Sequence, residues 1–569
     1  MDAVDDPMSA SAPEVAANAT TQPAADASEP TEAAQTEAPL PFPQEHLTTC
    51  LEVLSVLAKD LEVIEQPAMR NFRKTIAPVS DYMESRKFKG KGRKKYLEDK
   101  ELRREKEARQ VKRKMNDNKY INSATLRRAR VEKLQSLLEQ GKDEAMLPMI
   151  ADGAVEEAPA LLENGPKAPI AELEKQRSCY TCKVRYEQLH HFYDQLCPKC
   201  AELNYTKRMQ SADLRGRVAL VTGARVKIGF QAALKLLLSG ATVIATSRFP
   251  HDTAERYAAH PEFATFQDRL HVYGIDFRDM VHLEQFLDYV NTKYARLDMV
   301  VHNACQTIRR PPSYYSHMMP KETTPVASLP PSVQPILKQQ SDFHAELLRT
   351  AAPGSLLTAD GGGAVPPVLA NLSAVKTQIP MLLEDGANSS EHFPVGMKDV
   401  NGQQLDLRTT NSWVLKMGQV STPEVAEVFA INTLAPFIMN SRLRALMEAT
   451  PATDKFIINV SAMEGKFYRY KTPNHPHTNM AKAALNMMTR TCAEELSKHG
   501  IYMNSVDTGW INDENPLEKA HKYAQTANFQ TPIDEVDAAA RVLDPIFIGV
   551  NEHKYPFGLF FKDYAETEW

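Results

Sequence analysis

The stretch RVALVTGARVKIGFQAALKLLLSGATVIATSRFP, Arg217 to Pro250, decides the fold of this chain. Residues 218–221 form an apolar run without alternation, which is typical of a strand buried on both faces. Thr222-Gly223 turns the chain, and residues 228–238 carry apolar side chains at helical spacing before a Ser-Gly pair. Residues 242–246 are a second β-branched run. The pattern predicts a βαβ unit whose turn and helix start offer backbone N–H groups to a diphosphate.

A glycine turn alone is also compatible with any α/β crossover, so the identification of a nucleotide-binding fold depends on the segments that follow. Further strands are predicted at 271–275, 297–304, 456–460, 501–506 and 555–561, and helices at 427–436, from Thr478 onward and at 532–546. Polar residues stand at the ends or on the faces of these elements: Asp276, Asn303, Asn432, Ser461 and Lys482.

These pieces, in this order, resemble the short-chain dehydrogenase/reductase family from about residue 214 to 561. The resemblance implies an α/β fold, a Rossmann doubly wound parallel sheet with a long insertion at about 306–419. It implies a catalytic group at Asn432, Ser461, Thr478 and Lys482, in which Ser461 polarises the substrate oxygen and Asn432 organises a proton-relay water. The implied cofactor contacts are Gly223, Lys227, Ile228, Gly229, Ser247, Asp276, Phe277, Asn303, Ala304, Lys482 and Gly509.

The sequence departs from the family pattern at two site positions. Lys227 replaces the middle glycine of the turn, where its charge either points at a phosphate or blocks the site. Thr478 occupies the position of the catalytic Tyr, whose phenol works because a neighbouring Lys lowers its pKa from about 10. A Thr hydroxyl is a poor replacement, and Tyr468 or Tyr470 would have to fold back to serve.

Two other site assignments keep an alternative. The family spacing before Gly465 selects Ala462, whereas Ser461 supplies the only hydroxyl there. Asn432 is either catalytic or a buried amide that bridges backbone groups.

The residues after the second strand bear on the choice of cofactor. An acidic residue there would bind the ribose hydroxyls of NAD and repel a 2′-phosphate. The chain has Ser247-Arg248 instead, and Arg225 offers a second guanidinium. We therefore expect NADP(H) rather than NAD(H).

Two cysteine pairs, Cys179-x2-Cys182 and Cys197-x2-Cys200, are separated by fourteen residues. Four thiolates at this spacing predict a closed, structural zinc site, with incidental or redox cysteines as the alternative. His190 and His191 lie between the pairs and are expected to pack rather than to ligate. The short connection from Cys200 to Arg215 predicts that this ribbon docks near the reductase-like domain.

The N-terminal third has a different composition. Residues 1–43 are rich in Ala, Pro and acidic side chains and should be disordered. Residues 44–142 should be helical and charge-rich, with an amphipathic helix over 45–77 and a long solvated helix continuing through 126–138. Residues 143–172 read as a linker before the zinc-ribbon-like module at 173–210 and the Rossmann domain at 211–569.

Partners follow less directly from the sequence. The basic patch Arg86–Lys95 opens the segment 86–138, which either contacts nucleic acid or protein or is a solvated helix with ion pairs. Arg309-Arg310 in the insertion either binds an acidic substrate or forms ion pairs. The family resemblance implies that a homo-oligomer is an open alternative.

The composition limits the cellular compartments in which the protein is expected. The chain has 569 residues, a net charge of −5 and seven cysteines, four of them in tight pairs, which suits a reducing compartment. No run approaches the ~18 apolar residues of a membrane span, so we expect no membrane contact and a cytoplasmic protein, with the nucleus as the alternative.

Two functions are compatible with these features. The first is an NADP-dependent oxidoreductase acting on a carbonyl or alcohol. The second is a cofactor-binding scaffold without turnover, which contacts RNA or a protein through the basic helix and the ribbon. Lys227 and Thr478 are the features that separate the two.

Overall fold

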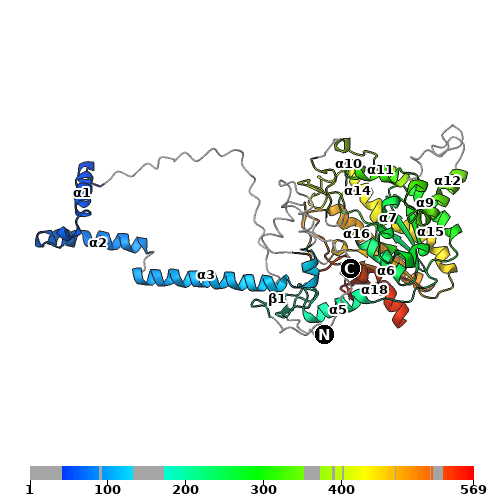
Figure 1. The fold of residues 1–569 in the computed structure, drawn as a ribbon, viewed down its shortest axis with the longest axis horizontal. Helices are drawn as coiled ribbons and strands as arrows, with labels where there is room; N and C mark the ends of the chain where they lie inside the picture. Colours follow the sequence, from blue (N-terminus) through cyan, green and yellow to red (C-terminus); the bar gives the residue numbers. More distant parts are fainter. Residues whose placement is uncertain are drawn as a thin grey trace, which may run out of the picture. The chain divides into compact units, whose positions relative to one another are not determined.

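The computed structural model describes residues 41–88, 92–130, 132, 172–350, 372–386, 391–399, 403–467, 470–512, 514–516 and 530–569. It divides into two compact units, Met1–Ala108 and Arg109–Trp569. The first unit contains α1 (Gln44–Leu57), α2 (Arg70–Lys87) and the first half of α3 (Arg93–Ile121), labelled in Figure 1. In the part of the chain that is described, no helix combines the length and apolar character needed to cross a bilayer.

The N-terminal helices differ from the sequence-based expectation. The amphipathic helix predicted over 45–77 ends at Leu57, because the side chain of Asp60 caps a new short turn at Leu61–Glu65. The long solvated helix ends at Ile121, and after a turn at residues 122–124 helix resumes at Thr125. The N–H groups of Thr125 and Leu126 donate to the carbonyls of His191 and Phe192 in the ribbon. The helix expected over 126–138 is thus found as far as Arg130, and residues 133–138 lie outside the described residues. The predicted tail up to residue 40 and the linker from 143 to 171 lie outside the described residues.

The second unit is built on an eight-stranded sheet in the order β10-β9-β8-β7-β6-β3-β4-β5. All neighbouring pairs are parallel except the last one, β9 with β10. The strands are β3 (Val218–Thr222), β4 (Thr242–Ser247), β5 (Leu270–Gly274), β6 (Met299–His302), β7 (Lys455–Ser461), β8 (Ile501–Asp507), β9 (Phe560–Lys562) and β10 (Ala565–Thr567). The chain changes direction between β3 and β6, which is the crevice where Rossmann folds bind nucleotides.

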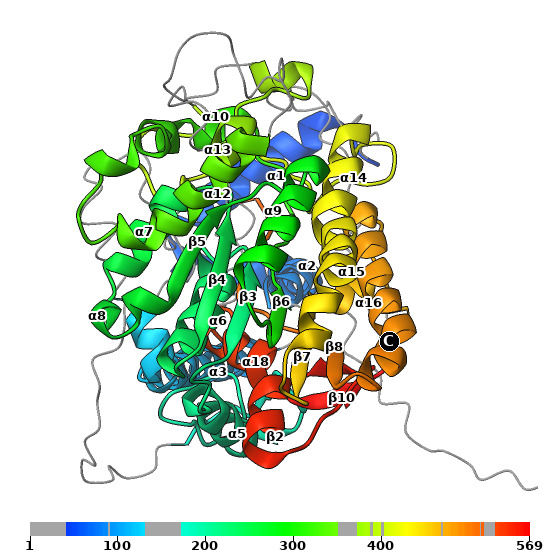
Figure 2. The ribbon, with the colours of Figure 1, turned by 90° about the vertical axis from the view of Figure 1, so that its right-hand side faces the viewer.

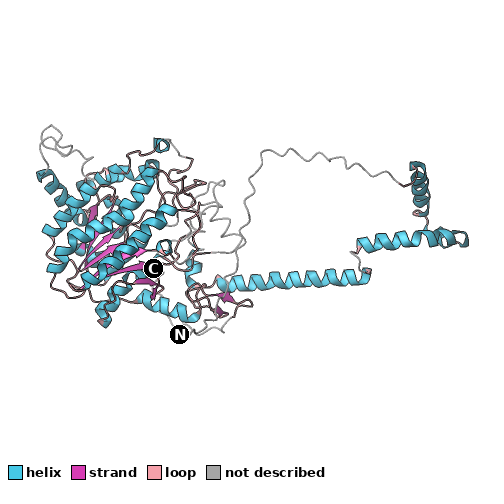
Figure 3. Cartoon of the chain, turned by 180° about the vertical axis from the view of Figure 1, so that it is seen from behind, coloured by secondary structure: helices cyan, strands magenta, loops and turns pink. Residues whose placement is uncertain are grey.

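Helices cover both faces of this sheet (Figures 2 and 3). On one face α6 (Lys227–Leu238) and α18 (Glu535–Glu552) share an apolar core with the strands. On the other face α9 (Met280–Lys293), α15 (Ala435–Ala449) and α16 (Pro476–Ser497) form a second core. The expected doubly wound α/β architecture is therefore confirmed, and α7 (Pro250–Ala258) and α8 (Phe263–Phe266) complete the first face.

The C-terminal end corrects one prediction. The last strand was expected over 555–561, but β9 spans Phe560–Lys562 only. The residues before it pack instead through aromatic rings, since Tyr555 stacks on Tyr502 with centroids 4.8 Å apart. After Asp563 and Tyr564, both at positive φ, the chain folds back as the antiparallel strand β10.

The cysteine ribbon consists of β1 (Arg177–Ser178), β2 (Arg185–Tyr186) and α5 (Pro198–Met209). It packs against α18 in an apolar cluster, and this cluster includes Tyr193 and Ile533. The Tyr193 hydroxyl donates to Asp537 at 2.5 Å, and Arg208 bridges Asp534 and Asp537. The ribbon therefore docks on the Rossmann domain, as its short connection predicted.

The insertion between β6 and α14 (Thr422–Phe429) crosses the sheet edge at β5. Its described helices are α10 (Pro312–Tyr315), α11 (Met319–Glu322), α12 (Lys338–Thr350) and α13 (Leu372–Lys376). The Gln340 side chain accepts from the backbone N–H of Gly274 at 2.8 Å, and Phe343 enters the second core.

Candidate active site

A cavity of about 810 Å³ opens at the carboxyl ends of the parallel strands. This volume is within the usual range for a site that encloses a small molecule or cofactor. All thirteen predicted cofactor contacts line it: Gly223, Arg225, Lys227, Ile228, Gly229, Ser247, Arg248, Asp276, Phe277, Asn303, Ala304, Lys482 and Gly509. The cavity is open although both Lys227 and insertion residues contribute to its wall.

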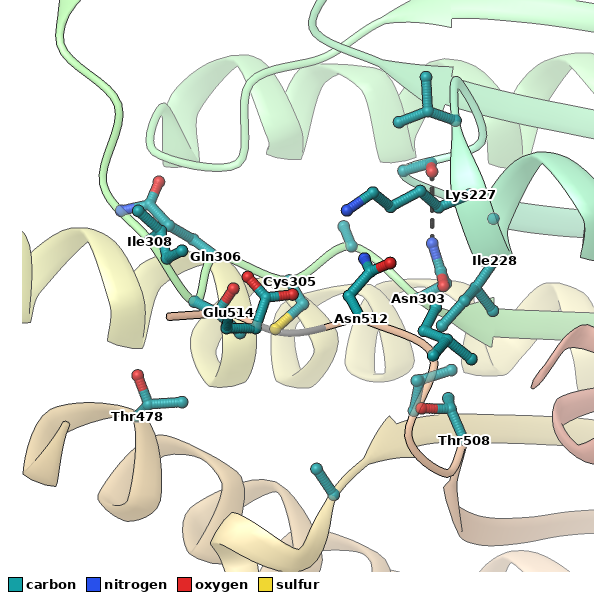
Figure 4. Close-up of a pocket in the computed structure, with 18 of the residues that line it drawn as sticks. Lys227, Ile228, Asn303, Cys305, Gln306, Ile308, Thr478, Thr508, Asn512 and Glu514 are labelled. Atoms are coloured by element: carbon teal, nitrogen blue, oxygen red, sulfur yellow. Dashed lines mark hydrogen bonds between the residues drawn. The ribbon is translucent and has the colours of Figure 1, made fainter. Parts of the chain in front are cut away.

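The glycine turn is shaped by close backbone approach. Gly223 has φ +66°, a conformation that favours glycine, and a Cβ on Gly229 would meet the Gly223 carbonyl oxygen at 2.2 Å. The Asn303 amide donates to the carbonyls of Thr222 at 3.0 Å and Gly223 at 3.3 Å (Figure 4). The turn is therefore fixed by a residue that directly follows β6, the strand paired with β3. The start of α6 faces the cavity.

Lys227 begins α6 with φ +53°, the left-handed conformation that explains why the family has glycine there. Its side chain extends into the cavity on the side of Asn512 (Figure 4). Lys227 thus adopts a backbone conformation typical of glycine, which strains a residue with a side chain. It also adds a positive charge to the cavity wall.

One end of the cavity, called here the adenosine end, contains Arg225 and Arg248. The Arg225 guanidinium pairs with Asp252 at 2.9 Å. Arg248 donates to the Tyr315 hydroxyl at 2.7 Å and stacks on the rings of Tyr315 and Phe249. Among the residues that the structure describes, no carboxylate forms an ion pair with Arg248. Burial opposes its charge, but Tyr315 and Asp276 together raise the pKa of Arg248, so it stays cationic.

Asp276 closes the same end from β5. Burial alone would raise the pKa of Asp276, but bonds from Arg278, which include one of 2.7 Å, lower it. Arg278 also bonds Glu427 of α14 at 2.9 Å. The carboxylate is therefore ionised and held by the protein, and the contact with the adenine of a cofactor that the family resemblance implies for Asp276 remains a prediction.

The other end, called here the reactive end, contains Ser461, Thr478 and Lys482. Ser461 is the last residue of β7, and Thr478 and Lys482 lie one turn apart on α16. The Lys482 ammonium donates to the Val460 carbonyl at 2.8 Å. The hydroxyls of Ser461 and Thr478 are buried and have no hydrogen-bond partner among the described residues. Buried polar groups are almost always paired, so these two hydroxyls are open to a ligand or a water molecule.

Asn432 does not line the cavity. It lies in a π-helical turn, Ala430–Leu434, between α14 and α15, and such turns often mark functional sites. Its amide accepts from the backbone N–H of Gln306 at 2.9 Å and donates to the carbonyl of the same residue at 3.1 Å. Asn432 thus fixes the loop after β6, and its part in a proton relay stays a prediction.

Of the two proposed substitutes for the missing Tyr, Tyr470 does not reach the site. Tyr470 is 93% exposed and is absent from the cavity wall, and Tyr468 lies outside the described residues. Thr478 faces Cys305, Gln306 and Glu514 across the opening (Figure 4). The reactive end therefore presents hydroxyl, thiol, amide and carboxylate groups at the place where the family has a phenol.

Two family models match the Rossmann part of the chain. One is described as short chain dehydrogenase and matches residues 217–324, and the other as enoyl-(acyl carrier protein) reductase and matches residues 411–543. The chain belongs to the short-chain dehydrogenase family. The gap between the two matched ranges coincides with most of the insertion, so neither family model covers that part of the chain.

Single proteins also resemble part of this chain. An uncharacterized protein of Acanthamoeba polyphaga mimivirus is 31% identical over 386 residues, 65% of this chain and 71% of the viral protein. A short-chain dehydrogenase from Streptomyces avermitilis is 17% identical, with 61% of this chain and 88% of that chain covered and a TM-score of 0.35. A short-chain dehydrogenase from Burkholderia cenocepacia, solved in complex with NADP, is 17% identical, with 61% and 96% covered and a TM-score of 0.37.

Several residues of the cavity wall were missed by sequence reasoning. The ribbon contributes Tyr180, Thr181 and Lys183, and the insertion contributes Tyr315 and Trp413. Trp413 stacks on His475, which precedes α16, with centroids 3.9 Å apart. The short link after Cys200 predicted docking of the ribbon, but no sequence pattern indicated which face of it would meet the cavity.

Two further polar motifs have partners within the protein, although Arg310 also lines the cavity. Arg309 bonds Asp385 with contacts of 2.7 and 2.5 Å, and Arg310 pairs with Asp406, so both form ion pairs within the protein. His190 packs against the rings of Tyr193 and Tyr205 rather than joining the cysteine cluster. The Sγ atoms of Cys179, Cys182, Cys197 and Cys200 all lie within 4.8 Å of one another.

Proposed function

We propose that this dehydrogenase interconverts a carbonyl and an alcohol and uses a nicotinamide nucleotide, with NADP(H) preferred over NAD(H). The observation that carries the proposal is the pair of buried, unpartnered hydroxyls of Ser461 and Thr478 beside Lys482, in the same cavity as the glycine turn. A fold alone hosts many functions, so this argument depends on the site.

The residues of the cavity fit a dinucleotide. A Cβ on Gly229 would fill the space in which the turn approaches Asn303, and the first N–H groups of α6 suit a diphosphate. Lys482 keeps two ammonium hydrogens beyond its bond to Val460 and can hold ribose hydroxyls. Such a nucleotide, when bound, supplies a carrier for hydride.

The preference for NADP(H) rests on Arg248. A buried guanidinium without a carboxylate partner favours an anion, and the planar fork of Arg suits a phosphate. The guanidinium lies 4.7 Å from the ring centre of Tyr315 and 5.7 Å from that of Phe249, and it bonds the Tyr315 hydroxyl, so its direction is set before any ligand arrives. Arg225 is already neutralised by Asp252 and contributes less.

At the reactive end, Ser461 would donate a hydrogen bond to the substrate oxygen and polarise the carbonyl. Thr478 can donate a second bond, but its hydroxyl is far too weak an acid to release a proton near neutral pH. We therefore expect slow turnover compared with a family member that has Tyr at this position. Replacing Thr478 by Tyr would restore an acid one turn from Lys482.

The test is a fluorescence titration with NADPH and NADH, followed by a panel of carbonyl substrates. We expect saturable NADPH binding, measurable carbonyl reduction, and faster reduction by Thr478→Tyr. Lys482→Ala is the matched control, and activity that survives this substitution unchanged would place the chemistry elsewhere. A wild-type chain that binds neither nucleotide excludes the proposal.

The alternative is a cofactor-binding scaffold that contacts RNA or a protein through residues 86–138. Thr478 is the observation that favours it, because the family acid is missing. NADPH binding without reduction of any carbonyl, in both the wild type and Thr478→Tyr, would select this function. Retardation of RNA that weakens steeply with salt would then identify the partner.

We also infer that the four cysteines hold one structural zinc ion. A tetrahedron with Zn–S distances of about 2.3 Å places neighbouring sulfurs about 3.8 Å apart. The Sγ atoms of Cys182 and Cys197 are 3.6 Å apart, which fits this geometry. Metal analysis of the purified chain should give about one zinc per molecule, and Cys182→Ser should lose it.

A further inference from the structure

The first cysteine pair forms part of the cavity wall. Between Cys179 and Cys182 the chain places Tyr180 and Thr181 against the cavity, and Lys183 follows them there. We call residues 179–183 the knuckle. The second pair, Cys197 and Cys200, contributes no residue to this wall. The two pairs therefore differ in position although both belong to one cysteine cluster.

Tyr180 connects the knuckle to the turn after β8. Its phenol oxygen accepts a hydrogen bond from the backbone N–H of Trp510 at 3.0 Å. Its own backbone N–H donates to Gln195 of the ribbon at 2.9 Å. Within the described chain the phenol hydrogen has no acceptor, so it is available to a ligand in the cavity.

Thr181 is the clearest sign of a ligand at the knuckle. Thr181 lines the cavity, and its hydroxyl is buried and has no hydrogen-bond partner in the described part of the protein. A buried hydroxyl of this kind normally finds a donor or an acceptor. Together with the phenol hydrogen of Tyr180, which no acceptor in the described chain takes up, it gives the knuckle two hydrogen-bond donors beside the cavity.

The knuckle is held rigidly. The Lys183 backbone has φ +63°, and its N–H donates to the Cys179 carbonyl at 3.1 Å. The Lys183 ammonium donates back to the Tyr180 carbonyl at 2.5 Å and lies 5.3 Å from the centre of the Tyr180 ring. Cys179 and Cys182 flank the two ligand-facing residues directly, so any ion that the cysteines hold also fixes Tyr180 and Thr181.

The position of the knuckle in the fold indicates which part of a bound dinucleotide would contact it. Tyr180 packs in the same apolar cluster as Ile228 at the start of α6 and Ile511 after β8. Ile228 and Thr508 lie together on one side of the cavity, while Thr478 lies across it (Figure 4). The start of α6 suits the diphosphate, and the family resemblance places the nicotinamide at Gly509. The knuckle is far in the sequence from both but contacts them in the fold.

We propose that Tyr180 and Thr181 bind the diphosphate and nicotinamide half of the cofactor, so that metal binding in the ribbon and nucleotide binding in the Rossmann domain are coupled. This inference rests on the proposed function. It adds two cofactor-positioning residues from outside the Rossmann domain and gives the ribbon a direct part in the site. It also predicts that the adenosine half binds without help from the knuckle.

The experiment compares NADPH with adenosine 2′,5′-bisphosphate, which carries only the adenosine half. We expect Thr181→Val, which keeps shape and removes the hydroxyl, to weaken NADPH binding by about tenfold and to leave the bisphosphate unchanged. Tyr180→Phe should act in the same direction. Lys199→Ala is the matched control, because Lys199 is the equivalent exposed residue of the second pair and should change neither affinity.

The role of the metal is tested with the same two nucleotides, NADPH and adenosine 2′,5′-bisphosphate. Removing the ion from the intact chain with a chelator should weaken NADPH more than the bisphosphate and increase amide hydrogen exchange at residues 509–511. Retained bisphosphate binding shows that the Rossmann domain is still folded in every variant.

The outcomes separate the two proposals. If the wild type binds NADPH and both Thr181→Val and Tyr180→Phe match it, the inference is wrong and the proposed function stands. If the wild type binds neither nucleotide, both are wrong. If the variants lose affinity but chelation changes neither NADPH binding nor exchange at 509–511, the coupling to the metal is excluded.

Discussion

The two ends of the cavity are completed in different ways. At the adenosine end the protein supplies partners for its own charges, since Arg225 bonds Asp252 and Arg248 bonds Tyr315. At the reactive end the hydroxyls of Ser461 and Thr478 are buried without partners in the described chain. The first end is organised before a ligand arrives, whereas the second needs one. Substitutions at the first end should thus alter affinity and nucleotide choice, and those at the second should alter turnover.

The largest effect is expected where the two ends join, at the glycine turn. In Gly229→Ala the new Cβ would meet the Gly223 carbonyl oxygen at 2.2 Å and the Asn303 amide at 2.3 Å, so the turn must move. We expect NADPH affinity to fall more than about 100-fold, or about 3 kcal/mol. Gly386→Ala is the control, because a Cβ there meets nothing within 4 Å. Unchanged NADPH binding in Gly229→Ala would remove the glycine turn from the site.

The organisation of the adenosine end depends on the insertion, and acid should loosen it. His282 of α9 stacks on Phe343 of α12, and burial lowers the pKa of His282 to about 4, against a weak opposing effect of Asp276. The unfolded chain takes up this proton near pH 6.5, above the folded value, so the stabilisation is complete above pH 6.5 and is lost as the pH falls towards 4. At pH 4.5 the loss from this one side chain is about 2–3 kcal/mol.

His282→Phe should abolish that share of the acid sensitivity. Urea unfolding at pH 7 and pH 4.5, followed by Trp fluorescence, would measure the difference. A variant with the same pH dependence as the wild type would show that His282 is not neutral in the folded protein. Loss of adenosine 2′,5′-bisphosphate binding over the same pH range would tie the adenosine end to the insertion.

Arg248 tests the chemistry of the adenosine end alone. Arg248→Leu removes the guanidinium that Tyr315 and Phe249 hold, and a phosphate loses one charge-assisted contact. We expect NADPH to bind roughly 10- to 50-fold more weakly, with NADH changed less than threefold. Competitive titration of the two nucleotides gives both values, and equal losses would mean that Arg248 only supports the fold.

The same contrast explains what sequence reasoning could and could not predict. The strand ends at Gly223, Asn303 and Ser461 were predictable, because buried strands have a clear apolar pattern and their polar ends meet at one edge of a parallel sheet. The wall residues Thr181 and Tyr315 were not, because they come from segments distant in the sequence. Their place depends on how the ribbon and the insertion dock, which no local pattern records.

Asn432 and Arg310 show a second limit. The sequence identified both as polar groups near the site, but whether a buried amide or guanidinium binds a ligand depends on the partners that the fold brings to it. Asn432 meets the backbone of Gln306, and Arg310 meets Asp406. Arg248 lacks such a carboxylate partner in the described chain, and this difference separates a candidate ligand group from a structural ion pair.

Lys227 gives the smallest expected effect and the finest test, because it lies between the two ends at the start of α6. Lys227→Gly relieves a left-handed residue with φ +53° but adds freedom to the unfolded chain, so stability should change by less than about 1 kcal/mol. The cavity is open with Lys227 in place, so we expect the ammonium to attract the diphosphate and its loss to weaken NADPH about three- to fivefold.

A matched Lys227→Met variant distinguishes the effect of the ammonium charge from that of the left-handed backbone. It keeps the long side chain and the backbone strain but removes the cation. Equal weakening in both variants, fading at high salt, would identify Lys227 as a point charge for the diphosphate. Tighter NADPH binding by Lys227→Gly would instead mean that the lysine obstructs the turn. In that case the departure from glycine would mark a site that has lost affinity for its nucleotide rather than one that binds it by another contact.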